Sequence, residues 1–190
     1  IGAWTDEQIA TAIRQGTRPD GRRLAPIMPY MLYNRLTDAD VKAMVAFLRS
    51  LPPVANQVAP VDNSKMFEMI PPTPPPKNEP VADDPVARGA YLASLMHCVM
   101  CHTPMGPQGP DLSKAFAGGA PMELPPMFGT GVLYTSNITS DAKTGIGAWT
   151  DDDIKRAITA GQRPSHGRLA GVPLAPMMWV SFYKALLPAD

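Results

Sequence analysis

The chain lacks several features that would assign a protein to a common class. It has only two cysteines in 190 residues, and both lie in one short stretch, which excludes a disulfide framework. Basic and acidic side chains number 17 each, so no net basic field favours nucleic acid. No apolar run approaches the roughly 20 residues that a bilayer span requires. We therefore expect no nucleic-acid partner and no membrane-crossing segment within this chain.

An initiating methionine is also missing, because the sequence opens at Ile1. No signal peptide is visible, and we expect that processing or further upstream chain explains this start. Proline, in contrast, is abundant at 23 residues, as is methionine at 12. The prolines concentrate in PPTPPP at positions 71–76, and this density predicts a stiff, extended linker over residues 54–80.

An internal repeat is the most informative pattern. IGAWTDEQIATAIRQGTRP at positions 1–19 matches IGAWTDDDIKRAITAGQRP at positions 146–164. LAPIMPYMLYNRLTDAD at positions 24–40 matches LAPMMWVSFYKALLPAD at positions 174–190. A match of this extent indicates two homologous domains rather than a shared helix pattern.

Each copy of the repeat is incomplete. The first copy continues into an expected helix over residues 38–50, which the second copy lacks. The second copy has an upstream part with both cysteines, which the first copy lacks. We expect three parts in order: the C-terminal half of a first domain (1–53), a proline-rich linker (54–80) and a second domain without its C-terminal helix (81–190).

Helix signals dominate the rest of the sequence. Thr5 and Gln8 form a capping-box pattern before an apolar helical face, and Gly16 is placed to end that helix. Asp84 followed by Pro85 opens a further helix that leads into the cysteines. No alternating apolar run is long enough to predict a strand. The predicted fold is mainly helical, with long loops.

The spacing typical of c-type haem attachment occurs in Cys98-Val99-Met100-Cys101-His102. Three residues apart on a helix, the two thiols lie on nearly the same face and are able to form thioethers with the two porphyrin vinyl groups. The next residue, His102, is placed to bind the iron. The alternatives are a zinc half-site, which would need a second ligand pair, and a thioredoxin-like redox pair. The motif predicts covalent haem c, with His102 as an iron ligand.

A sixth iron ligand should come from a distant part of the sequence. Methionine in that position would raise the reduction potential into a range suited to carrying electrons. The repeat helps to choose among the methionines, because Met178 aligns with Met28, whereas Met177 aligns with Ile27, which cannot bind iron. We expect Met178 to be the distal ligand, with Met177 as the alternative.

Three further residues are candidates for contacts around the haem. The carbonyl of Pro110 is placed to accept the free ring N–H of His102, although an ordinary turn is the alternative. Arg163, which the repeat pairs with Arg18, is a candidate partner for a haem propionate or else a solvated arginine. Trp149, which the repeat pairs with Trp4, is expected in the core near the haem edge.

The two other histidines are not expected to bind iron. His97 precedes Cys98 but has no place in the attachment geometry, so we expect it to be solvated or bonded to the backbone. His166 lies in a five-residue insertion of the second copy, and we expect it on the polar surface, with contact to a propionate as the alternative.

The chain resembles class I cytochrome c domains in RGAYLASLMHCVMCHT, in SNITSDAKTGIGAWTDDDI and in LAPIMPY. More narrowly, it is similar to the multi-haem cytochrome subunits of bacterial membrane-associated dehydrogenases of the alcohol and gluconate dehydrogenase type. In that family each domain holds one haem, with the methionine of a Met-Pro-Tyr segment as distal ligand. The resemblance therefore implies that Met28 binds the iron of a second haem, and that the chain is a pair of tandem cytochrome c-like domains.

The sequence departs from the family pattern at two places. Trp179 and Val180 stand where Pro-Tyr would follow Met178, and the first copy has no cysteine motif. We expect the missing motif in an upstream stretch of the native protein. The alternative is a single permuted domain around one haem, in which the helix 38–50 packs on the helix 84–95 and Gly89 permits close approach.

The resemblance implies an electron-transfer subunit that is not itself an enzyme. It would accept electrons from a catalytic dehydrogenase partner and pass them to a quinone, an oxidase or a soluble cytochrome. The resemblance also implies a periplasmic location, with membrane association through segments outside this chain. Two alternatives are a haem enzyme of the di-haem peroxidase or thiosulfate-oxidising type, which needs a displaceable distal ligand, and a structural unit of a multi-haem assembly.

Overall fold

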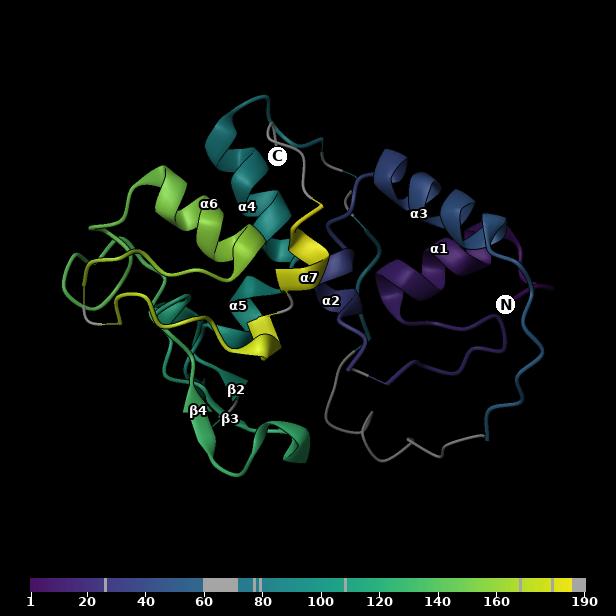
Figure 1. Cartoon of the computed structure of the whole chain (residues 1–190). Helices are drawn as coiled ribbons and strands as arrows, with labels where there is room; N and C mark the ends of the chain where they lie inside the picture. The colour runs from purple at the N-terminus through teal and green to yellow at the C-terminus, as the bar shows by residue number, and fades with distance from the viewer. Residues whose placement is uncertain are drawn as a thin grey trace. The chain divides into compact units, whose positions relative to one another are not determined.

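The computed structural model describes most of the chain (Figure 1). The described residues are 1–25, 27–59, 72–76, 78, 80–107, 109–167, 169–178 and 180–185. They form two compact units, Ile1–His97 and Cys98–Asp190. The secondary structure is mainly helical with a small amount of sheet, which confirms the predicted helical character. Much of the predicted linker, namely residues 60–71, 77 and 79, lies outside the described residues.

The described residues of the first unit form the helices α1 (Asp6–Gln15), α2 (Tyr30–Tyr33), α3 (Asp38–Ser50) and α4 (Pro85–Leu95). Helix α1 begins where predicted, because Thr5 Oγ1 accepts the Gln8 N–H at 3.2 Å and Gln8 Oε1 accepts the Thr5 N–H at 2.9 Å. It ends at Gly16, whose φ of 65° is left-handed. A side chain at position 16 would also collide with the Tyr30 ring, 2.4 Å from the would-be Cβ.

The core of the first unit forms where the apolar faces of α1 and α3 meet the segment after α2. Its fully buried members are Ile9, Ile13, Leu36, Val41 and Val45. Each such side chain contributes about 1.5–3 kcal/mol relative to exposure. Met28 and Trp4 are partly buried and pack against this cluster.

Arg14 links α1 to the start of α3 from within the core. Its guanidinium donates to Asp38 Oδ1 at 2.7 Å and to the carbonyl of Leu36. The Arg14 side chain is 7% exposed and that of Asp38 is 56% exposed. The buried cation therefore reaches a carboxylate that remains in contact with water, which lowers the cost of burying it.

Helix α4 packs on the same core through Tyr91 and Leu95. The Tyr91 hydroxyl donates to Asp40 Oδ2 and accepts the N–H of Thr37 at 3.2 Å. The sequence assigned α4 to the second copy of the repeat, so this contact crosses the boundary between the two copies. The expected role of Gly89 is wrong, because a Cβ added there would meet nothing within 4 Å.

The second unit combines short helical turns with two small antiparallel ladders. Its helices are α5 (Cys98–Cys101), α6 (Asp151–Ala160) and α7 (Val180–Tyr183), and its 3₁₀ turns are η2 (Leu112–Lys114), η3 (Pro126–Phe128) and η4 (Pro176–Met178). Strands β1 (Met105–Gly106) and β2 (Gly109–Pro110) form one ladder, and β3 (Pro121–Glu123) and β4 (Val132–Tyr134) form the other. Strands of two or three residues are too short to show an alternating pattern, which is why the sequence did not predict them.

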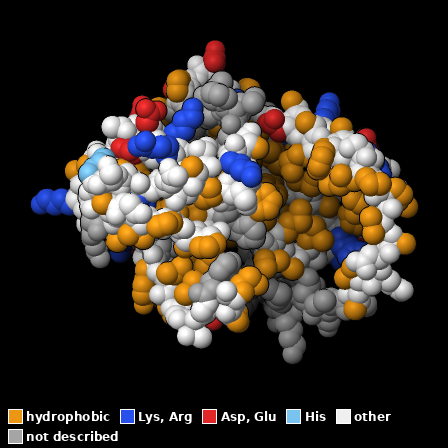
Figure 2. All heavy atoms as spheres, viewed as in Figure 1, with side chains coloured by type: hydrophobic (Ala, Val, Ile, Leu, Met, Phe, Trp, Pro, Cys, Tyr) orange, Lys and Arg blue, Asp and Glu red, His pale blue; other side chains and the backbone are white. Residues whose placement is uncertain are grey.

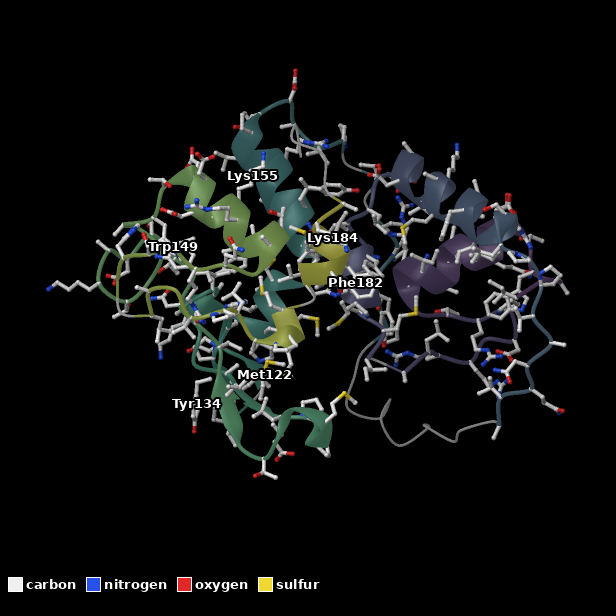
Figure 3. All side chains as sticks on the ribbon, in the orientation of Figure 1. Met122, Tyr134, Trp149, Lys155, Phe182 and Lys184 are labelled. Carbon is white, nitrogen blue, oxygen red and sulfur yellow. The ribbon has the colours of Figure 1, made fainter. Side chains whose placement is uncertain are left out.

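The β3–β4 hairpin exposes apolar side chains on one face. Tyr134 opposes Pro121 in the ladder and is 71% exposed, whereas Met122 opposes Leu133 on the other face and is half-buried. Figure 3 shows Tyr134 and Met122 extending from the hairpin in different directions, and Figure 2 shows apolar side chains at the surface of this unit.

The sequence repeat recurs as a repeat of local structure. Thr150 and Asp153 form the same capping box as Thr5 and Gln8, and Gly161 ends α6 with a φ of 68°. Backbone hydrogen bonds from N–H to carbonyl also recur at equivalent positions of the two copies. Trp4 donates to Ile1 as Trp149 donates to Ile146, and Leu24 donates to Gly16 as Leu174 donates to Gly161. Met28 likewise donates to Ala25, as Met178 donates to Ala175. Residues 186–190 of the second copy lie outside the described residues.

Replacing Tyr91 with phenylalanine should change the pH dependence of stability. Burial first, and the hydrogen bond to Asp40 second, raise the pKa of the Tyr91 phenol above its ordinary value. A pKa raised by folding stabilises the protein fully below the unfolded pKa, and this contribution is lost as the pH rises through the folded pKa. Urea unfolding between about pH 8 and about pH 11 should therefore show the chain and Tyr91→Phe converging in stability at the alkaline end.

The control is Tyr134→Phe, which removes the hydroxyl of an exposed ring. A stability difference between the chain and Tyr91→Phe that stays constant over the whole pH range would contradict the raised pKa of Tyr91.

Candidate haem site

The two cysteines occupy the ends of α5, a single helical turn. Both are half-buried and free, and their three-residue separation places the thiols on nearly the same face. Burial raises the pKa of the Cys98 and Cys101 thiols, so both remain protonated at neutral pH. This turn therefore presents two free, neighbouring thiols, the groups from which thioethers to two vinyl groups form.

His102 follows the turn and is oriented by the backbone at two points. Its N–H donates to the Cys98 carbonyl at 2.9 Å, which continues the helical pattern of α5. Its ring atom Nδ1 lies 2.7 Å from the carbonyl oxygen of Ser136. Because a carbonyl oxygen only accepts hydrogen bonds, Nδ1 carries the proton, and the lone pair of Nε2 is left free for a metal.

Pro110, which the sequence suggested as the acceptor for His102, lies in β2 opposite Met105 and is exposed. The carbonyl within hydrogen-bonding distance of His102 Nδ1 is that of Ser136. The physical reason is that the short β1–β2 ladder folds residues 105–110 back on themselves, and a more distant segment reaches the histidine.

The segment 116–119 makes hydrogen bonds both to the region of His102 and to the segment after β4 that supplies the acceptor. On one side, Gly118 N–H donates to the His102 carbonyl at 2.8 Å, and Phe116 N–H donates to the fully buried Thr103 hydroxyl at 3.2 Å. On the other side, Gly119 N–H donates to the Thr135 carbonyl at 2.8 Å. These bonds join the attachment turn to the Ser136 segment.

Met177 and Met178 both lie in η4 and both are half-buried, so burial does not separate them. The recurring backbone bond from Met178 N–H to Ala175, 2.9 Å long, places Met178 in the same local structure as Met28. Met178 and Met28 as iron ligands stay predictions that rest on the repeat.

Arg163 has partners within its own loop. Its Nη1 donates to the carbonyls of Val172 and Pro173, at 3.1 Å each. Burial lowers the pKa of Arg163. These bonds hold the loop between α6 and η4 closed, and contact with a propionate stays a prediction.

Trp149 is half-buried and lies in the loop that precedes α6, as Figure 3 shows. Its N–H donates to the Ile146 carbonyl at 2.9 Å, which tightens the turn before the Thr150 cap. Its expected position near the haem edge stays a prediction.

His97 differs from what the sequence suggested. Its ring packs on Tyr33, with centroids 5.3 Å apart, and its Nε2 is buried with no hydrogen-bond partner. Burial lowers the pKa of His97, which favours the neutral ring. The prediction of a solvated or backbone-bonded histidine is therefore wrong for this atom, because folding buries it away from water and from hydrogen-bond acceptors of the described residues. His166 is exposed, as predicted.

Sequence reasoning missed Ser136 and Gly118. Ser136 acts through its backbone, which no side-chain pattern reveals. The Gly118-Gly119 pair was a visible signal for a close backbone approach, and the neighbouring Asn-Ile-Thr stretch at 137–139 was noted only as part of the resemblance.

The donor set fits haem c. It consists of two neighbouring free thiols and an adjacent histidine whose Nε2 lone pair is available, within a unit that also contains half-buried methionines. The orientation of a ligand histidine by a backbone carbonyl is the usual arrangement at metal sites.

Comparisons with known proteins agree with this donor set. No protein-family model matches the chain. A fructose dehydrogenase cytochrome subunit from Gluconobacter japonicus is 33% identical over 194 residues, covering 92% of this chain and 37% of that protein. An alcohol dehydrogenase (quinone) cytochrome c subunit from Gluconobacter oxydans is 34% identical over 191 residues, covering 90% of this chain and 38% of that protein. A diheme cytochrome c-type protein from Cereibacter sphaeroides is 31% identical over 182 residues, covering 90% of this chain and 58% of that protein.

These similarities define the chain as a homologue of c-type cytochromes, and that homology implies covalently bound haem c. More narrowly, the chain is a homologue of the cytochrome c subunits of alcohol, fructose and gluconate dehydrogenases, at 29% to 34% identity over 90% or more of its length. It spans less than half the length of these subunits. Within the described part of the chain, every helix is too short or too polar to cross a bilayer.

The haem-free chain should hold His102 in the Nδ1–H form. We expect this because the Ser136 carbonyl accepts a proton from Nδ1 at 2.7 Å. Long-range ¹H–¹⁵N correlation spectra at about pH 8, where an ordinary imidazole is neutral, distinguish the two tautomers. The exposed His166 is the internal control, and a His102 spectrum with the proton on Nε2 would contradict the geometry.

Proposed function

We propose that the chain is part of an electron-transfer cytochrome c subunit. It receives electrons from a catalytic dehydrogenase subunit and passes them to a respiratory acceptor, which is a quinone, an oxidase or a soluble cytochrome. The observation that carries the proposal is the attachment turn, where two free thiols adjoin a histidine whose Nδ1 is bound to the Ser136 carbonyl. The names of the relatives, which are cytochrome subunits of dehydrogenases, supply the partner.

The chain's own residues have distinct roles in this proposal. Cys98 and Cys101 would hold the porphyrin through thioethers, and His102 Nε2 would be one ligand of the iron. Met178 would be the second ligand, and thioether ligation of this kind raises the reduction potential and closes the site to substrates. The chemistry that haem c supplies when bound is the uptake and release of one electron at its iron.

A second haem belongs to the first copy of the repeat in this proposal, with Met28 as distal ligand. Support comes from the recurring hydrogen bonds of the two copies and from the similarity to a diheme cytochrome. The attachment motif for that haem is expected outside the 190 residues, since this chain has only two cysteines. In the proposed tandem arrangement, residues 1–53 form the C-terminal half of the first domain, residues 54–80 the linker and residues 81–190 the second domain.

One observation favours the alternative of a permuted single domain. Helix α4 packs on the core of the first unit, and its Tyr91 bonds to Asp40 and Thr37. A pyridine haemochrome count on the intact protein separates the two arrangements. Two or more haems per polypeptide support tandem domains, and one haem supports the permuted domain.

The proposed location is the periplasm, because bacteria attach c-type haem outside the cytoplasm. The expected membrane association rests on segments outside this chain and on the dehydrogenase partner. Fractionation of cells that produce the intact protein tests this, since a haem-loaded form in the cytoplasm would contradict it.

Covalent haem should depend on both cysteines. We expect the chain, matured with a cytochrome c assembly system, to carry one haem that survives denaturation, because it has one attachment motif. The double variant Cys98→Ala/Cys101→Ala should carry none. Haem staining after denaturing electrophoresis and intact mass measure this, with His166→Ala as the control. Covalent haem in the double variant would overturn the proposed attachment.

Substitution of Met178 should remove the distal ligand, and substitution of the adjacent Met177 should not. We expect Met178→Leu to lose the long-wavelength iron–sulfur charge-transfer band of the ferric protein and to lower the reduction potential, because thioether ligation raises it. The neighbouring Met177→Leu removes a sulfur from the same turn and should retain both properties. The opposite result would assign the ligand to Met177, and retention of the band by both variants would assign it to another methionine of the chain. Absence of the band from the parent chain would favour a haem enzyme with a displaceable distal ligand.

A further inference from the structure

Gly118 has a backbone conformation and a position that no other residue type accommodates. Its φ is 72°, in the left-handed region. A Cβ at this position would lie 2.4 Å from the Ser136 carbonyl carbon, 2.5 Å from the Asn137 nitrogen and 2.6 Å from the Ser136 oxygen. All three atoms belong to one peptide group, so no side-chain rotation would relieve the collision.

The same peptide group is the one that contacts the haem ligand. The Ser136 oxygen that a Cβ on Gly118 would displace is the oxygen 2.7 Å from His102 Nδ1. Gly118 N–H in turn donates to the His102 carbonyl at 2.8 Å. Gly118 therefore touches His102 through one hydrogen bond and the histidine's acceptor through van der Waals contact.

The peptide at position 136 has little freedom to move elsewhere. On one side of it, Thr135 N–H donates to the Ala120 carbonyl at 3.1 Å, and on the other, Ile138 N–H donates to the Phe116 carbonyl at 2.9 Å. Because both flanks are held to the segment that contains Gly118, a larger residue at 118 would rotate or displace the 136–137 peptide rather than shift the whole strand.

We propose that Gly118 is a positioning residue that sets the hydrogen bond between His102 and Ser136, and through it the reduction potential. This inference rests on the proposed role of His102 as iron ligand. A strong bond from Nδ1–H to a carbonyl increases the electron density on Nε2, which favours the ferric state. Weakening that bond favours the ferrous state and raises the potential.

Gly119 provides a matched control. Its φ is 82°, so an alanine there incurs a similar backbone cost, yet its would-be Cβ meets nothing within 4 Å. Gly119→Ala should therefore behave like the parent chain in both measurements of the test.

The test compares Gly118→Ala with Gly119→Ala in two states of the chain. In the haem-free chain, ¹⁵N spectra should show that Gly118→Ala moves part of His102 to the Nε2–H tautomer, whereas Gly119→Ala leaves it unchanged. In the haem-loaded chain, Gly118→Ala should change the ferric-to-ferrous ratio at a fixed potential about tenfold in favour of the ferrous form, which is about 59 mV for one electron. Equal behaviour of the two variants in both states would overturn the proposal.

Thr103→Val is the milder variant if Gly118→Ala yields too little folded protein. It removes the hydroxyl that accepts Phe116 N–H and so loosens the same segment without a collision. We expect a shift of the His102 tautomer in the same direction, and an unchanged tautomer would overturn the proposal. Failure of the parent chain to bind haem would refute the proposed function, and the haem-free spectra would still test Gly118.

Discussion

The candidate site depends on one hydrogen bond, from Nδ1 of His102 to the carbonyl of Ser136. That bond decides which ring nitrogen carries the proton and therefore which one is free to bind iron. The remaining contacts of this region maintain it. Thr103 accepts the Phe116 N–H, Gly118 binds the His102 carbonyl, and Gly119 binds Thr135. Because the acceptor is a backbone atom, its position follows from the course of the chain rather than from any side chain at position 136.

The two copies of the repeat share one local backbone structure, once in each unit. The capped helix, its terminal glycine and the turn at Met28 have counterparts around Met178, with backbone bonds that agree to within 0.2 Å. The two copies differ where side chains meet. A Cβ added at Gly16 would collide with the ring of Tyr30, whereas a Cβ added at Gly161 would lie 3.4 Å from the smaller side chain of Val180. The two copies therefore share a backbone and differ in the side chains that pack against it.

The contact between α4 and the core of the first unit joins segments that the sequence assigns to different copies of the repeat. Tyr91 of α4 binds Thr37 and Asp40, and α4 is the helix that leads into the attachment turn. The mainly buried partners of Tyr91 and Leu95 give this contact an apolar basis that does not depend on salt.

The sequence by itself determined the chemistry and most of the helices. Cys98, Cys101 and His102 are recognisable because covalent attachment needs a fixed local spacing, and the ends of α1 and α6 are recognisable because capping uses residues three apart. Only the tertiary structure decided the partner of the His102 ring, the burial of His97 against Tyr33 and the packing of α4 on the first unit. These features join residues far apart in the chain, in part through backbone atoms. Local patterns carry no information about such contacts, because they arise only when distant segments fold against each other.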